Sequence, residues 1–239
     1  FAGLKPDAAV LVATIRALKM NGGKAKNELT ESDPEAVKRG LPNLLRHMHN
    51  LKKYGLPIVV ALNIFPSDTE EEKKVVFEAC KEAGVPVAES TVFADGGEGG
   101  LDLGEKVLAA IDQGSNYKPL YDLDLSLKEK IETIAKEIYG ADGVAFDGAA
   151  AKELAHIEEM GYGKMPVCIA KTPVSFSDDP SKLGAPSGFT LHVREVKVSA
   201  GAGFVVALTG KIMTMPGLPR RPAAERIDVD DEGNITGLF

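Results

Sequence analysis

Residues 7–23 constrain the fold of this chain more than any other segment. The apolar run DAAVLVAT at 7–14 is typical of a buried parallel strand. The continuation IRALKMNGG follows without a break and places Arg16, Lys19 and a glycine pair after the strand. Open α/β sheets hold their ligands at the carboxyl ends of such strands. We therefore expect a central parallel strand, covered on both faces, that leads into a cationic turn at 16–23.

Composition excludes several classes of protein. The chain has 239 residues, 44% of them hydrophobic, and a net charge of −7, which argues against nucleic-acid and anionic-membrane partners. No stretch is apolar enough to span a bilayer and no leader precedes the first strand, so we expect a cytoplasmic protein. Cys80 and Cys168 are expected to be buried free thiols, and the scattered histidines predict no metal site.

The first part of the chain alternates strands and helices. This alternation predicts parallel pairing with right-handed crossovers. The expected elements are a helix from Asp33 to Gly55 interrupted at 40–42, a strand at 56–62, a helix from a capping box at 67–70 to Ala83, a strand at 85–90 and a helix at 101–111.

The second part has a different pattern. Gln113–Asn116 is the best linker candidate, which divides the chain into regions 1–115 and 116–239. The expected elements are a helix from a capping box at 126–129 to Tyr139, strands at 144–146 and 167–170 around a helix at 149–160, and antiparallel strands at 189–198, 204–208 and 211–213. The fold class is therefore α/β, with parallel-sheet β/α units followed by a smaller mixed α+β region.

Two aromatic residues follow neighbouring strands of the expected parallel sheet. Phe65 comes after a strand that ends at Asn63, with Pro66 beside it, and Phe93 follows the next strand. An exposed aromatic at such a position offers a stacking face for a flat ring. The alternative for Phe65 is an apolar staple that packs against the helix behind it. The two rings could also flank one ligand from both sides.

The glycine-rich loop GGEGG follows Phe93 and has two interpretations. Glycines let backbone amides approach a phosphate or carboxylate, although Glu98 in the middle of the loop disfavours an anion. The other interpretation is a turn in which Gly96 and Gly97 shape the pocket around Phe93.

Asp178 and Asp179 also have two interpretations, a cation site or a turn, and the turn is favoured.

Several blocks of the sequence resemble formate–tetrahydrofolate ligases (10-formyltetrahydrofolate synthetases). The first is VATIRALKMNGG at 12–23, a match over contiguous positions. Further blocks are ALNIFPSDT at 61–69, FADGGEGG at 93–100, KPLY at 118–121, IYGADGV at 138–144, SFSDD at 175–179, MTMPGLP at 213–219 and the closing ITGLF.

The resemblance implies a P-loop-type nucleotide fold and an activity. Ligases of this family join formate to tetrahydrofolate through formyl phosphate, giving 10-formyltetrahydrofolate, ADP and phosphate. They use ATP with Mg²⁺, are activated by a monovalent cation and are homotetramers. The resemblance also implies that Phe65 and Phe93 sandwich the adenine or pterin ring, although many members have Trp at the second position. Arg16 and Lys19 are then candidates to pair with phosphate, formate or the folate glutamate, or else to form salt bridges with acidic side chains.

Members of the family carry a phosphate loop ending Gly-Lys-Ser/Thr in a longer N-terminal half. The chain contains no such tripeptide, so we expect it to be the C-terminal two-fifths of the enzyme. Catalytic residues are then expected in that N-terminal half, and the half itself is an expected partner of this chain. The isolated chain is expected to be inactive. The alternative is a non-catalytic nucleotide- or folate-binding fragment, or a split subunit that completes the active site of a separate chain.

Overall fold

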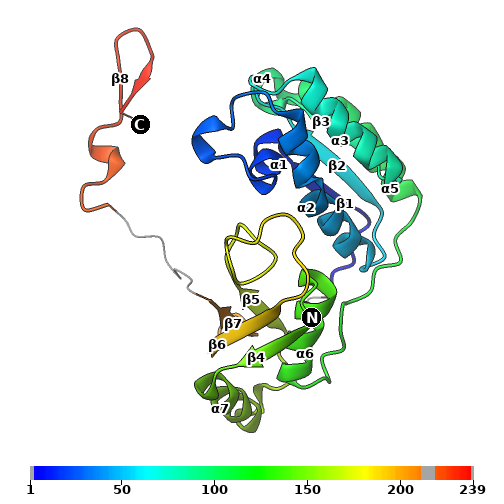
Figure 1. Ribbon diagram of the computed structural model, residues 1–239, viewed down its shortest axis with the longest axis vertical. Coiled ribbons are helices and arrows are strands. Elements are labelled where there is room, and N and C mark those ends of the chain that lie inside the picture. Colours follow the sequence, from blue (N-terminus) through cyan, green and yellow to red (C-terminus); the bar gives the residue numbers. More distant parts are fainter. Residues whose placement is uncertain (1–2, 211–218, 238–239) are drawn as a thin grey trace.

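The computed structural model describes residues 3–210 and 219–237, which form an α/β structure (Figure 1). The first region is built on a three-stranded parallel sheet in the order β1–β2–β3. Its strands are β1 (Ala9–Ala13), β2 (Ile58–Asn63) and β3 (Val87–Ser90). Parallel pairing confirms the α/β class expected from the sequence.

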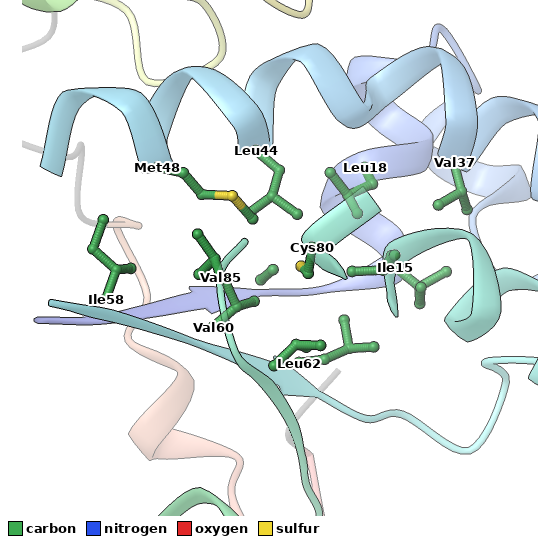
Figure 2. Packing of buried hydrophobic residues seen from close by; sticks show 13 residues of the cluster. Ile15, Leu18, Val37, Leu44, Met48, Ile58, Val60, Leu62, Cys80 and Val85 are labelled. Atoms are coloured by element: carbon green, nitrogen blue, oxygen red, sulfur yellow. The ribbon is translucent and has the colours of Figure 1, made fainter. Parts of the chain in front are cut away.

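Helices connect and cover these strands. They are α1 (Ile15–Asn21), α2 (Pro34–Lys52), α3 (Glu70–Glu82), the short α4 (Val92–Asp95) and α5 (Leu101–Asp112), with 3₁₀ turns η1 (Lys26–Glu28) and η2 (Gly96–Gly100). Figure 2 shows the core between the sheet and the helices, where Leu44 and Met48 of α2 face Ile58 and Val60 of β2. This core fixes the carboxyl ends of the strands.

The expected central position of the first strand is wrong. In the described part of the chain β1 pairs only with β2, so it lies at the edge of the sheet. Val10 and Val12 are 44% and 64% exposed, whereas β2 is buried along almost its whole length. The continuous apolar run does not distinguish an edge strand from a central one, because both faces of β1 carry apolar side chains.

The expected turn after β1 is instead a helix. Thr14 caps α1 by accepting a hydrogen bond from the Ala17 N–H at 3.1 Å, and Gly22 ends the helix. The interruption expected at 40–42 is also absent, because α2 continues through Pro42. Gly40 has a packing role here: a Cβ at this position would lie 2.0 Å from the Leu18 carbonyl oxygen, so only glycine lets α1 approach α2 this closely.

The start of α3 lies two residues later than expected. Its N-cap is Thr69, which accepts from the Glu72 N–H while the Glu72 carboxylate accepts from the Thr69 N–H at 3.0 Å. This reciprocal pair is a capping box and satisfies two backbone donors at the helix end. The shift leaves residues 64–68 as a loop between β2 and the helix.

The second region contains a four-stranded mixed sheet in the order β4–β6–β7–β5, with β6 and β7 antiparallel. Its elements are α6 (Leu127–Ile134) continued by the π-helical turn η3 (Ala135–Tyr139), β4 (Gly143–Phe146), α7 (Gly148–Ile157) with η4 (Glu158–Tyr162), β5 (Val167–Ala170), β6 (Thr190–Ser199) and β7 (Phe204–Thr209). These elements match the expected mixed α+β pattern, while the strand expected at 211–213 lies outside the described residues. The turn η5 (Ala223–Glu225) and a hairpin of β8 (Asp228–Val229) and β9 (Ile235–Thr236) follow.

The two sheets share no strand in the described residues, and the segment after α5 joins the regions. The division at 115/116 stays a prediction, since the Asn116 N–H donates a hydrogen bond to the Gly55 carbonyl of the first region at 3.0 Å.

Both cysteines are free, but Cys168 is exposed, contrary to the expectation of two buried thiols. It lies on a half-covered strand of the second sheet. Within the described ranges, no helix is long and apolar enough to cross a membrane.

Candidate ligand site at the carboxyl ends of the first sheet

A hollow of about 430 Å³ lies where β2 and β3 end. The loop that follows β2 forms one wall, and α4, which follows β3, forms the other. Because the strands are parallel, their carboxyl ends meet at one edge of the sheet, which is where α/β folds bind ligands. The lining residues are Asn63, Ile64, Phe65, Pro66, Thr91, Phe93, Ala94 and Asp95.

Phe65 is held in place from behind. Its N–H donates to the Asp68 carboxylate at 2.9 Å, which fixes the loop backbone. The Arg16 guanidinium lies over the ring, with its carbon 4.3 Å from the ring centroid, and also reaches the Ser67 hydroxyl at 3.5 Å. Arg16 does not line the hollow, so this cation–π contact supports the Phe65 ring from outside it.

Phe93 is held by no such contacts. The residue is 99% exposed, so it lies on the surface and not in the core. The residue lies on α4, which ends at Gly96 with φ +60°, a conformation that favours glycine. Phe93 and half-buried Phe65 thus line one hollow from two different segments.

The position of Phe65 also decides between its two interpretations. An apolar staple stands directly before the helix cap, but the cap of α3 is Thr69 and the residue before it is Asp68. Ile64, not Phe65, packs against the core of the first region. The staple interpretation is therefore wrong for Phe65.

Two buried polar atoms behind Phe65 lack a hydrogen-bond partner. They are Arg16 Nε and Asp68 Oδ1. Burial raises the pKa of the Asp68 carboxyl, against the lowering effect of the bond from the Phe65 N–H. Such unsatisfied groups are uncommon in folded proteins and often accompany function.

Lys19 and Glu72 form a buried ion pair next to this wall. The Lys19 ammonium lies 2.9 Å from Glu72 Oε1, and both side chains are fully buried. Glu72 also accepts from the Asp33 N–H at 2.8 Å, and Lys19 donates to the Glu31 carbonyl at 2.9 Å. Burial by itself raises the pKa of Glu72, but the bonds from Asp33, Lys19 and Thr69 bring it below its usual value. The pair thus ties α1, the loop at 31–33 and α3 together.

The structure brings four of the residues predicted to bind substrate into the hollow. Asn63, Phe65, Pro66 and Phe93 all line it, as expected from their places after β2 and β3. Sequence reasoning missed Thr91, which lines the hollow from its position directly after β3. The sequence could have indicated Thr91, because the residue that follows a parallel strand lies at the carboxyl edge of the sheet, where ligands bind.

The other predicted residues lie elsewhere. Arg16 supports Phe65 from outside the hollow, and Lys19 is enclosed by its salt bridge, which is the alternative that the sequence left open. Gly96 and Gly97 are exposed and do not line the hollow. A Cβ at either glycine would meet no atom within 4 Å, so neither is held against a neighbour.

The described part of the chain offers no preformed metal site. No cluster of three or more His, Cys, Asp or Glu side chains is arranged there to hold an ion. Asp179 accepts from the Ser181 N–H at 2.9 Å, which makes the turn favoured from the sequence. Asp178 instead accepts from the His192 N–H at 3.1 Å.

Comparison with known families shows which family the chain belongs to. A family model described as formate–tetrahydrofolate ligase matches residues 1–239. The chain belongs to this family. Formate–tetrahydrofolate ligases catalyse an ATP-dependent reaction with formate and tetrahydrofolate in one-carbon metabolism.

Proposed function

We propose that the hollow between Phe65 and Phe93 binds the flat ring of a substrate, adenine or pterin, for the ligation of formate to tetrahydrofolate. The observation that carries the proposal is the pairing of a supported ring with a fully exposed one in a single hollow. Stacking on an aromatic side chain contributes about 1–3 kcal/mol per ring. Asn63 and Thr91 add polar groups at the edge of the hollow, where ring nitrogens and amino groups need partners.

Replacement of either aromatic tests this proposal. We expect Phe65→Ala and Phe93→Ala each to weaken the ring-bearing ligand by about five- to a hundredfold. Titration calorimetry with ATP and with tetrahydrofolate measures this. Tyr117→Ala, which removes an exposed aromatic outside the hollow, is the matched control and should change neither affinity. Unchanged affinity in both phenylalanine variants, with the fold intact by circular dichroism, would contradict the proposal.

A larger ring at Phe93 should strengthen binding. We expect Phe93→Trp to lower the Kd of one of the two ligands by about two- to fivefold, because indole adds roughly 20–40 Å² of apolar contact. Phe93 is 99% exposed, so a larger side chain at this position displaces no packed neighbour. The same titrations check it, with the second ligand as internal control. A loss of affinity would show that the hollow is too narrow for indole.

We infer further that residues 1–239 do not contain the whole catalytic machinery. Activation of formate by ATP needs Mg²⁺, a lysine and backbone amides around the γ-phosphate. No lysine lines the hollow, and the described residues offer no metal cluster. The proposal assigns Mg²⁺, the monovalent-cation site and the phosphate loop to an N-terminal half of the same enzyme, with association into a homotetramer in the cytoplasm.

Activity measurements separate this proposal from its alternative. We expect the purified 239-residue chain to form no 10-formyltetrahydrofolate from ATP, formate and tetrahydrofolate, and to bind at least one ring-bearing ligand. Product formation by the chain alone would overturn the inference about missing machinery. Binding without turnover, restored to turnover by an added N-terminal chain, would favour the split-subunit alternative.

A further inference from the structure

A second cavity, of about 480 Å³, lies between the two regions and shares no lining residue with the Phe65–Phe93 hollow. One wall is a face of α2 formed by Asn43, His47 and Asn50, which recur at helical spacing, and Tyr54 extends it from the turn after the helix. The opposite wall comes from Tyr139 and the loop after β5, which contributes Lys171 and residues 173–176.

Lys171 supplies a positive charge to this cavity. Its ammonium donates to the Thr172 carbonyl at 2.9 Å and to the Ser175 carbonyl, which leaves one of its three protons free. It lies 5.1 Å from the ring centroid of Tyr139 and 5.9 Å from that of Phe176. No carboxylate lines the cavity, and in the described residues Lys171 forms no salt bridge. Burial lowers its pKa, as expected for a cation without an anionic partner.

Asn50 supplies an unused acceptor. Its side chain is buried, with the residue 6% exposed, and its Nδ2 donates to the Ile138 carbonyl at 2.8 Å. Its Oδ1 has no hydrogen-bond partner. A buried amide oxygen without a donor costs free energy, which a ligand N–H or O–H would recover.

Aromatic rings make up part of the remaining lining, beside Ala17, Met20 and Asn21 of α1. The buried ring of Phe176 and the ring of Tyr139 flank the lysine, and the His47 ring lies 4.6 Å from Phe176, centroid to centroid. His47 stands at the exposed rim, where partial burial and then the charge of Lys171 lower its pKa. Of the described residues that line the cavity, Lys171 is the only lysine or arginine.

We propose that this cavity binds a small, singly charged carboxylate that carries an N–H donor and an apolar body. The carboxylate pairs with the Lys171 ammonium, the N–H donates to Asn50 Oδ1, and the apolar part packs on Phe176 and Tyr139. A carboxylate fits better than a phosphate ester, whose charge approaches −2 and which needs several donors. This inference goes beyond the proposed ring-binding site and does not rest on it.

Hippurate (N-benzoylglycine) is a suitable probe, because it combines a carboxylate, an amide N–H and a phenyl ring. Proton NMR of the wild-type chain follows the four histidine Cε1–H signals during titration. We expect the His47 signal to shift and to saturate with a Kd of about 1 mM, while those of His49, His156 and His192 stay in place. Hippuramide, which lacks the charge, should bind at least tenfold more weakly.

Variants test the assigned contacts. We expect Lys171→Met to weaken hippurate by at least tenfold, Asn50→Leu by about fivefold, and Lys171→Arg by less than threefold. Lys182→Met is the matched control, since Lys182 also lies over an aromatic ring, Phe189, but does not line the cavity. If Lys171→Met does not fold, the hippurate–hippuramide comparison on the wild-type chain decides the question.

Three outcomes would overturn the proposal. The first is a His47 signal that does not move up to about 20 mM hippurate, a concentration well above the expected Kd. The second is equal binding of hippurate and hippuramide, which would remove the role of the lysine. The third is inorganic phosphate binding as tightly as hippurate, which would make the cavity a general anion site rather than a carboxylate site.

Discussion

Glu72→Gln should lower the free energy of unfolding by about 3–5 kcal/mol, the largest effect we expect from a single substitution in this chain. The change leaves the Lys19 ammonium fully buried without its negative partner. It also weakens the acceptor for the Asp33 and Thr69 N–H groups. Urea unfolding followed by circular dichroism measures the loss.

Glu70→Gln is the matched control for this prediction. Glu70 lies in the same first turn of α3, but its side chain is 84% exposed in its pair with Lys73. Its replacement should change stability by no more than about 0.5 kcal/mol. A similar loss in both variants would show that charge near the helix start, rather than the buried pair, is responsible.

The same pair predicts an acid dependence. Because the pKa of Glu72 is lowered on folding, its stabilisation is present above the unfolded value near 4.5 and is lost as pH falls through the folded pKa. The stability difference between wild type and Glu72→Gln should therefore narrow below about pH 4.5. A difference that stays constant down to pH 3 would contradict the assignment.

Gly40→Ala should destabilise the chain by about 1–3 kcal/mol although it places a better helix former inside α2. The added Cβ would lie 2.0 Å from the Leu18 carbonyl oxygen, so α1 must move away from α2. Arg16 moves with α1, and the support of Phe65 is then disturbed. We expect a lower urea midpoint together with weaker binding of the ring-bearing ligand.

Gly104→Ala provides the opposite case. Gly104 lies inside α5, and a Cβ there would meet no atom within 4 Å. The substitution should raise stability by about 0.5–1 kcal/mol through helix propensity alone. Opposite signs for the two glycines would isolate the close approach of α1 and α2 as the cause. A gain at both positions would mean that α1 adjusts without cost.

Local patterns predicted most elements of the fold. Capping residues and apolar runs located β5 and α6 closely, and alternation located β6. These local patterns gave wrong predictions where contacts with other elements determine the structure. The edge position of β1 depends on which strands are present to pair with it, and α2 continues through Pro42 although proline usually breaks a helix.

The candidate site was predictable to the same extent. Phe65 and Phe93 followed from their places after neighbouring parallel strands, and they do line one hollow. The contact of Arg16 with the Phe65 ring was not predictable, because it needs the helical geometry of α1. Lys19 and Arg16 are three residues apart, and only the fold shows that one is enclosed and the other supports the site.

The edge strand β1 has a practical consequence for work with this chain. In the described residues its outer backbone groups face no partner strand, and Val10 and Val12 add exposed apolar side chains beside them. Unprotected edges of this kind join to one another across molecules. Concentrated preparations should therefore form oligomers that grow with time and scatter light. A lysine in place of Val12 is the smallest change expected to keep the molecules apart.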